Sequence, residues 1–152
     1  MKTMRARLTE EMKTAMKSGD KARLSTIRLM LSAIKDLDIA NRGLGEEAGG
    51  EAELLQLFAK MVKQREESAK IYTEGGRPEL AAQEKSEIVV IQGFMPQQLS
   101  DEDAAKAIKE IIAATGASGI KDMGRVMAEI RAAFAGQMDF GKASGLIKNL
   151  LT

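Results

Sequence analysis

Residues 94–103, FMPQQLSDED, separate two sets of helical patterns and so decide the fold. Pro96 disfavours helical geometry at the residue before it, so a helix must end here. Ser100 followed by three acidic residues is typical of a new helix start, because a hydroxyl can cap free amides and negative charge suits the positive end of the helix dipole. We therefore predict a boundary between two helical lobes at residues 95–99.

Four helices are predicted on the N-terminal side of this break. Apolar residues recur at helical spacing, and turn signals separate the segments 1–17, 21–40, 51–74 and 78–94. Ser18-Gly19-Asp20 supplies a helix-ending glycine followed by a capping acid, and Gly75-Gly76-Arg77-Pro78 ends one helix and starts the next. Residues 41–50 contain four glycines and no apolar period, so they are predicted to form an exposed loop.

Three shorter helices are predicted on the C-terminal side. Apolar residues at helical spacing mark segments centred near residues 108, 127 and 147, and the second of these helices is expected to open at Ser118. No alternating strand pattern persists anywhere along the chain. The predicted fold is all-α, with a four-helix N-terminal lobe at residues 1–96 and a three-helix C-terminal lobe at residues 97–152.

Composition excludes several kinds of chemistry. The 152 residues include no Cys and no His, so the chain has no disulfide, no Cys-His pair and no zinc site of the ordinary ligand type. Ser118-Gly119-Ile120-Lys121 matches the S-x-x-K of acyl-enzyme hydrolases, but the companion motifs are missing and the short pattern is common by chance. We expect no catalytic residues, no metal and no cofactor.

The apolar runs of the chain are shorter than a membrane span. Residues 1–30 also interleave Lys and Arg with apolar residues and so lack the continuous apolar core of a signal peptide. We therefore expect a cytoplasmic protein with no membrane partner.

Positive charge is concentrated near the N-terminus. Residues 1–35 contain nine basic and three acidic residues. Residues 36–97 contain seven basic and twelve acidic residues, and residues 98–152 contain seven of each kind. This asymmetry suggests a polyanionic partner such as RNA; the alternative is a solvated helix face, favoured by the absence of aromatics for base stacking. Lys35 belongs to this basic segment, and the candidate RNA contacts within it are Arg5, Arg7, Lys13, Lys17, Lys21, Arg23 and Arg28.

A second group of candidate RNA contacts lies at the expected start of the sixth helix. Ser118 is predicted to cap this helix, whose free amides favour an anion. Lys121 and Arg125 are four residues apart, so they share one helix face beside those amides. Gly124 lies between them and is grouped with the same candidate site.

Charged residues also interrupt the apolar stripes of the third and fourth helices. In an antiparallel hairpin that turns near Gly76, Arg65 lies about level with Glu87 and within roughly two turns of Glu84. We predict a partly buried pair between this arginine and a carboxylate, with a structural role.

Three stretches of the chain together resemble the YqeY family, whose members are related to the tail of the GatB subunit of tRNA-dependent amidotransferase. They are KTAMKSGDKARLSTIRLMLSAIK (13–35), KQREESAKIYTEGGRPELAAQEKSEIVVIQGFMPQQLS (63–100) and GASGIKDMGRVMAEI (116–130). Met95 and Phe140 depart from the family pattern. The residues that carry the resemblance are Asp20, Arg23, Leu24, Arg28, Gly76, Arg77, Leu80, Glu84, Glu87, Pro96, Leu99, Ser100, Lys121, Asp122, Met123, Gly124 and Met127.

The resemblance implies a two-lobed helical fold whose C-terminal lobe is similar to the amidotransferase tail. In the full amidotransferase that tail helps to hold the outer corner of tRNA, whereas glutamine hydrolysis and amide transfer occur in other domains and another subunit. The implied function is a non-catalytic tRNA- or RNA-binding accessory protein of translation. Fold-level likeness does not carry over the neighbouring domains' chemistry.

Two alternatives stay open. One is a protein-interaction module whose C-terminal lobe docks on an aminoacyl-tRNA synthetase, an amidotransferase or a ribosome-associated protein. The other is an amidotransferase-like component acting in trans, that is, part of a carbon-nitrogen ligase with glutamine as amido donor.

Overall fold

Every regular element of the computed structural model, which describes residues 2–152, is helical, so the prediction of an all-α fold is confirmed. The chain is rich in Ala, Leu, Met, Lys and Glu, which lose little freedom in a helix. Within the described span the elements are α1 (Met4–Ser18), α2 (Lys21–Gly43), α3 (Glu51–Glu74), α4 (Pro78–Gln92), α5 (Asp101–Thr115), the 3-10 turn η1 (Ile120–Asp122), α6 (Met123–Phe134) and α7 (Phe140–Leu151).

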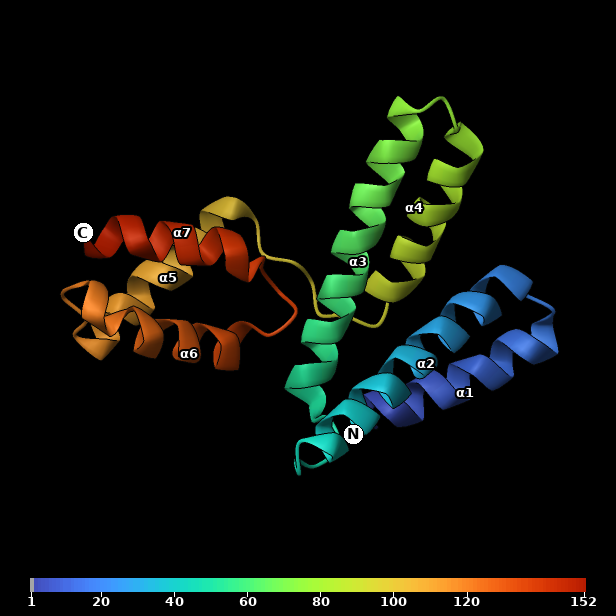
Figure 1. Cartoon of the computed structure of the whole chain (residues 1–152), viewed down its shortest axis with the longest axis horizontal. Coiled ribbons are helices and arrows are strands. Elements are labelled where there is room, and N and C mark those ends of the chain that lie inside the picture. The colour runs from blue at the N-terminus through green and yellow to red at the C-terminus, as the bar shows by residue number, and fades with distance from the viewer. Residues whose placement is uncertain (1) are drawn as a thin grey trace. The chain divides into compact units, whose positions relative to one another are not determined.

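Local capping groups set the ends of α1 and α2. The Thr3 hydroxyl accepts a hydrogen bond from the third amide of α1, and Gly19 ends this helix with a φ of 74°, which an L side chain rarely adopts. The Asp20 carboxylate then accepts a hydrogen bond from the Arg23 amide at 3.1 Å, which caps α2. The two helices form an antiparallel hairpin, drawn in blue to cyan in Figure 1.

A second hairpin consists of α3 and α4. Gly76 has a φ of 73° in the turn, and Pro78 occupies the first helical position of α4, where its missing N–H has no intrahelical partner to lose. The two helices pack along their length, as Figure 1 shows in green. Small residues, Ala69 on α3 and Ala81 on α4, are buried in the half of the hairpin near the turn.

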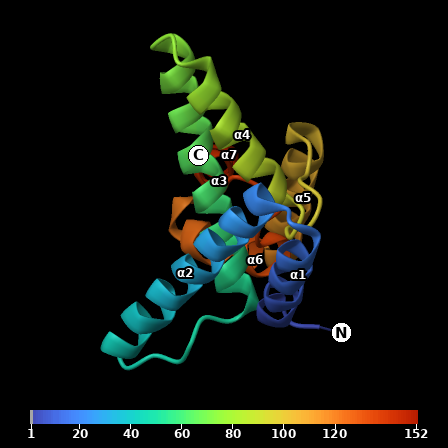
Figure 2. The same ribbon diagram turned by 90° about the vertical axis from the view of Figure 1, so that its right-hand side faces the viewer.

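The core of the N-terminal lobe lies where the two hairpins meet (Figure 2). Each of the four helices contributes at least one side chain with no exposed surface, namely Leu8, Ile27, Phe58 and Ile91. Full burial of such side chains stabilises the fold by roughly 1.5–3 kcal/mol each. On α3 the core residues end at Val62, so the half of the hairpin beyond this point packs chiefly on itself.

The loop before α3 is shorter than the sequence predicts. Helix α2 continues to Gly43, whereas its apolar pattern ends near residue 40. Asn41 is only 6% exposed and donates a hydrogen bond to Glu53 at 3.3 Å, and Gly49 is buried as well. The extra turn forms because this contact with α3 gives the Asn41 amide a partner, which a sequence period cannot reveal.

The C-terminal lobe consists of α5, α6 and α7 around a separate core. Its fully or almost fully buried side chains are Ile108, Val126, Ile130 and Ile147, each at most 1% exposed. Ser100 caps α5 by accepting a hydrogen bond from the Asp103 amide at 3.1 Å, as its position in the sequence predicts.

The chain divides into two compact units, one ending at Met95 and the other beginning at Pro96. Phe94 and Met95 pack in the core of the first unit. Leu99 packs against the core of the second unit, and its amide donates to the Gln137 carbonyl at 2.8 Å. The connection between the two cores is therefore short.

Candidate functional site

The basic residues of the first two helices fall into two classes, those that the fold pairs and those that it leaves to solvent. Lys2 forms an ion pair with Glu10. Arg23 Nη2 lies 3.1 Å from Glu11 Oε2, which links α2 to α1. These pairs account for part of the N-terminal positive charge without any external partner.

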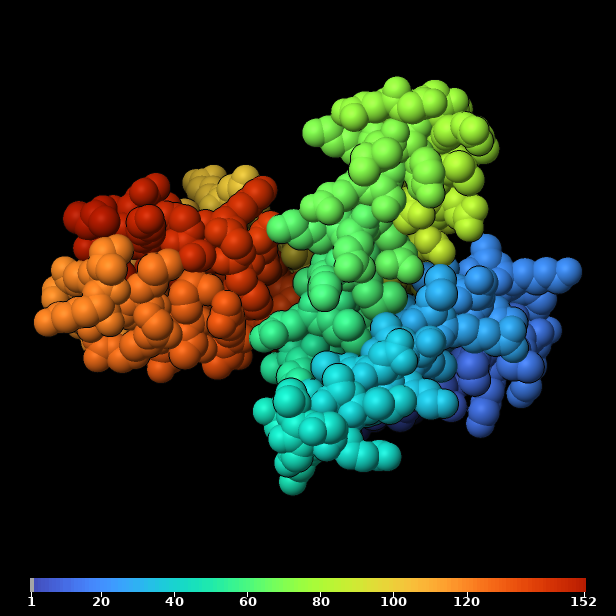
Figure 3. Space-filling view, in the orientation of Figure 1, coloured from blue at the N-terminus to red at the C-terminus, as the bar shows by residue number. Residues whose placement is uncertain are grey.

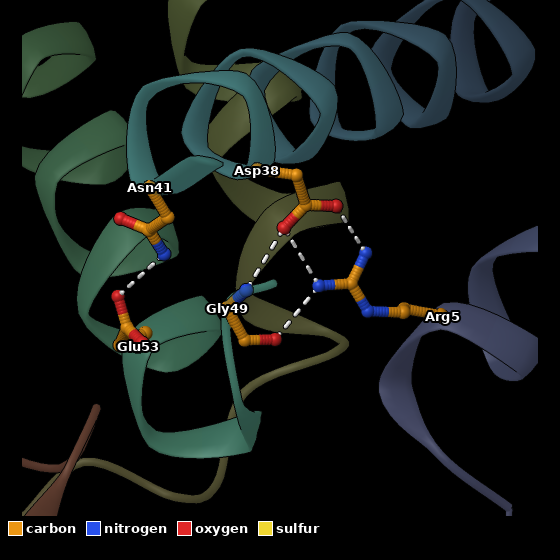
Figure 4. A network of polar contacts seen from close by, with 5 residues as sticks. All are labelled: Arg5, Asp38, Asn41, Gly49 and Glu53. Carbon is orange, nitrogen blue, oxygen red and sulfur yellow. Dashed lines mark hydrogen bonds and ion pairs between the residues drawn. The ribbon is translucent and has the colours of Figure 1, made fainter. Parts of the chain in front are cut away.

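Arg5 belongs to the paired class and closes a small network at the end of α2 (Figure 4). Its guanidinium donates to both carboxylate oxygens of Asp38, at 2.7 and 3.0 Å, and to the Gly49 carbonyl at 2.7 Å. The Gly49 amide in turn donates to Asp38 at 2.9 Å. The bond from Arg5, and then that from Gly49, hold the pKa of Asp38 below its usual range, while Asp38 raises the pKa of Arg5. Arg5 thus fastens the loop before α3 to α1 and α2.

Arg7 and Arg23 share an aromatic partner. Their guanidinium carbons lie 5.2 and 5.5 Å from the centroid of the Phe94 ring, which is 3% exposed. Both distances are within the range of a cation–π interaction. These two arginines therefore help to hold the end of α4 against the α1–α2 hairpin.

The unpaired class lies on the outer faces of the same hairpin. Each member is exposed and has no ion pair or hydrogen bond from its charged group to any described residue: Lys13, Lys17, Lys21, Arg28 and Lys35. Lys21, Arg28 and Lys35 follow one another at intervals of seven residues on α2, so they form a line along one face of this helix. We call these three residues the α2 row.

A shallow hollow of about 360 Å³ lies between the first two members of the α2 row. It is lined by Lys21, Leu24, Ser25, Arg28 and Leu29. In the part of the chain that the structure describes, the Ser25 hydroxyl has no hydrogen-bond partner. The hollow thus combines two cations and an available hydroxyl.

The start of α6 differs from the prediction. The sequence places the helix start at Ser118, but α6 begins at Met123 after the short turn η1. The Asp122 carboxylate folds back and accepts a hydrogen bond from the Ser118 amide at 3.0 Å. This bond, with a further one from the Gly119 amide, holds the pKa of Asp122 below its usual range. The amides expected to attract an anion therefore already hold a carboxylate of the chain itself.

The neighbouring residues of the predicted α6 site are affected too. Arg125 Nη2 donates to Asp122 Oδ1 at 3.3 Å, so this cation is partly neutralised. Lys121 is exposed but lies close to the same carboxylate. Gly124 lies in the first turn of α6, where a side chain would meet open space. The structure brings these residues together around an internal acid.

A model of the YqeY family, described as Yqey-like protein, matches residues 5–151. The chain belongs to the YqeY family. This match spans both lobes and confirms the resemblance seen in the sequence.

Three fungal relatives of this family member are named Altered inheritance of mitochondria protein 41, mitochondrial. The protein of Saccharomyces cerevisiae (strain YJM789) is 33% identical over 90 residues, which cover 59% of this chain and 47% of the relative. That of Lachancea thermotolerans is 34% identical over 92 residues, covering 60% and 48%. That of Eremothecium gossypii is 32% identical over 105 residues, covering 67% and 56%. The chain thus spans about half the length of the relatives it matches.

The predicted arginine–carboxylate pair of this YqeY family member lies between α3 and α4. Arg65 Nε is 3.4 Å from Glu87 Oε2, and the two side chains are only 16% and 15% exposed. Arg65 Nη1 also donates to the Met61 carbonyl at 3.2 Å. Among the residues described, Glu87 and not Glu84 is the carboxylate that meets this arginine.

Some residues around the candidate site carried no usable signal in the sequence. Asp38 meets Arg5 across 33 residues, and Phe94 meets two arginines from other helices. Asp122 was different, because it stands four residues after Ser118 and a short acid at such a spacing can reach back to a free amide.

Over residues 2–152, no helix is both long and apolar enough to cross a membrane, and no three Asp or Glu side chains gather as a metal site.

Proposed function

We propose that this YqeY family member is a non-catalytic accessory protein of translation that binds RNA, tRNA in particular, through phosphate contacts made by the unpaired cations of the α1–α2 hairpin. One observation carries the proposal. On a hairpin where Lys2, Arg5 and Arg23 are matched with carboxylates, the α2 row stays exposed and unmatched.

The charge distribution supports RNA as the partner class. Residues 1–35 carry six more basic than acidic residues, which raises the local concentration of a polyanion around this end of the chain. Lysines and arginines that reach phosphates release condensed counterions, so several weak contacts add up to useful affinity. The paired cations Arg5, Arg7 and Arg23 serve the fold in this proposal, and the start of α6 contributes less than its sequence suggests.

The choice of tRNA and of translation rests on the family resemblance. The tail of the amidotransferase GatB subunit, to which YqeY proteins are related, helps to hold tRNA, and the proposal transfers this binding without the amidotransferase chemistry. We place the protein in the cytoplasm; the fungal relatives are named mitochondrial, so the same RNA-binding role would operate there in an organelle.

A charge-reversal experiment tests the proposal. Lys21→Glu, Arg28→Glu and Lys35→Glu are combined in one variant, and Lys60→Glu, Lys70→Glu and Lys85→Glu in a matched control. The control residues are exposed and unpaired, and lie in the acidic middle of the chain. Binding of fluorescent bulk tRNA is followed by anisotropy at two salt concentrations, and thermal unfolding checks that both variants fold.

The α2-row variant should lose affinity on the order of 100-fold, and its log-log salt slope should fall by roughly 2 to 3, because about three phosphate contacts disappear. The control has the same change in net charge and should lose far less. Equal losses in both variants, or no binding by the wild type at about 0.15 M salt, would contradict the proposal.

A second candidate function, protein docking, is favoured by a hollow in the C-terminal lobe. It measures about 330 Å³, lies between α5 and α7, and is lined by apolar side chains such as Ala105, Ile108 and Leu146 and by the charged residues Asp101, Asp139 and Lys142. Its apolar part suits a salt-tolerant interface with another protein. Ala105→Glu would place a carboxylate in this hollow. If that variant loses a salt-insensitive protein complex while its tRNA binding is unchanged, the result would support docking.

A further inference from the structure

The α2 row is a set of charges at fixed intervals. Lys21, Arg28 and Lys35 are separated by seven residues, so neighbours are about 10.5 Å apart and the row is about 21 Å long. Helix α2 is continuous through this span and packs a different face, with Ile27 and Ile34, into the lobe core. The spacing of the three charges is therefore set by a rigid rod.

The surface around the row is open to a large partner. Figure 3 shows α2, in blue to cyan, along the surface of the N-terminal lobe. Leu29, between the row positions, is 42% exposed, and Ser25 supplies a hydroxyl inside the hollow between Lys21 and Arg28. A hydroxyl can bond to a phosphate oxygen or to a ribose 2′-OH.

The aromatic side chains, unlike the cations of the α2 row, are buried or half-buried. Single-stranded nucleic acids are held largely by stacking their bases on exposed aromatic rings. This chain has four Phe, one Tyr and no Trp. Phe58 and Phe94 are buried in the N-terminal core, and the remaining three, Tyr72, Phe134 and Phe140, are half-buried. None of the five presents a fully exposed ring, so the surface can read a phosphate backbone but offers no stacking platform.

We infer that the α2 row docks along the phosphate backbone of double-helical RNA and prefers it to single-stranded RNA. The inference rests on the proposed function and names the class of RNA bound. A duplex already holds its phosphates in a rigid array, so a rigid row of cations gains contacts without the entropy cost of ordering a flexible strand. Double-stranded RNA is recognised mostly through phosphates and 2′-hydroxyls, which are the groups that Lys, Arg and Ser can reach.

A double-stranded and a single-stranded RNA of equal strand length test the inference. Anisotropy titrations of the full chain compare a blunt RNA duplex of about 20 base pairs with an unstructured single strand of the same number of nucleotides per strand. Salt is varied for each ligand, and the α2-row charge reversals and the matched Lys60, Lys70 and Lys85 control are measured alongside. Both variants are first shown to unfold at the wild-type temperature.

We expect the duplex to bind at least about tenfold more tightly than the single strand, and the row variant to lose most of this preference while the control keeps it. Equal or tighter binding of the single strand would overturn the inference and leave RNA binding itself intact. A duplex preference that survives the row reversals would overturn the assignment to α2. Absence of binding to both oligonucleotides and to bulk tRNA would overturn the proposed function together with the inference.

Discussion

The starts of α2 and α6 look alike in sequence, since each places Lys and Arg beside the free amides of a helix, but the fold treats their charges differently. At the start of α2, Asp20 caps the Arg23 amide and Arg23 pairs with Glu11 on α1, but Lys21 stays unpaired, as do Arg28 and Lys35 farther along the helix. At α6, Asp122 takes the Ser118 amide and pairs with Arg125. A basic residue is available to a partner only where the fold supplies no acid of its own, which a count of charges along the chain cannot show.

The same contrast exists within the N-terminal lobe. Arg7 and Arg23 lie over the Phe94 ring, and Arg5 is held by Asp38 and Gly49, so these three arginines connect helices. The α2 row connects nothing within the lobe. Four changes would break or sharpen this division between structural and available charge, and they are ordered here by expected effect.

Removal of the Phe94 ring should have the largest effect. Phe94→Ala empties a site that is 3% exposed and removes the aromatic face that two arginines share, so we expect a loss of about 3–5 kcal/mol in the free energy of unfolding. Phe94→Leu keeps most of the volume and should cost much less. Urea unfolding of both variants measures the difference; equal costs would mean that the aromatic face, which both variants lose, matters more than the packed volume.

Loss of the partly buried carboxylate between α3 and α4 should come next. Glu87→Ala leaves Arg65 largely buried without its ion-pair partner, and should cost about 2 kcal/mol, less than a fully buried pair because both side chains keep some exposure. Glu84→Ala, three residues earlier on α4, is the matched control and should stay within about 0.5 kcal/mol. Denaturant unfolding distinguishes them, and a larger cost at Glu84 would refute the assignment of the pair.

Removing the Asp122 carboxylate at the start of α6 should have a moderate effect on RNA binding. Asp122→Ala frees the Ser118 amide and releases Arg125, so both groups become available to a phosphate. Affinity for tRNA should rise by about three- to tenfold, and the log-log salt slope should steepen by roughly 0.7–0.9, as for one added phosphate contact. Glu129→Ala, a charge-matched change farther along α6, serves as the control, and an equal rise there would point to net charge alone.

The smallest effect should appear in how the free energy of unfolding changes at acidic pH. Because the pKa of Asp38 lies below its ordinary value of 3.8 in the folded chain, its stabilising contribution is fully present above that value and is lost as the pH falls through the lowered pKa. Asp38→Asn should therefore be less stable than the wild type at about pH 7, and this difference should shrink by about pH 3. Asp36→Asn, exposed and without a partner in the described chain, is the control. Unfolding at both pH values checks the sign.

Local signals in the sequence were sufficient for most of the helices. The turns at Gly19 and Gly76 and the cap at Ser100 act within a few residues, so their chemistry is visible in the order of the chain. The end of α2 and the start of α6 were not predicted correctly. Asn41 extends α2 through a bond to Glu53, and Asp122 displaces the helix start through a bond to Ser118. In both places a side-chain contact outweighs the apolar period.

By itself the sequence determined the all-α class, the family, the absence of His and Cys chemistry and the concentration of basic residues near the N-terminus. Only the tertiary structure decided which of those basic residues are paired, because Asp38 and Phe94 come to Arg5, Arg7 and Arg23 from distant parts of the chain. The helical periodicity of a sequence indicates only which face of a single helix is apolar. The pairing of charges depends on which faces of different helices the packing of the core brings together.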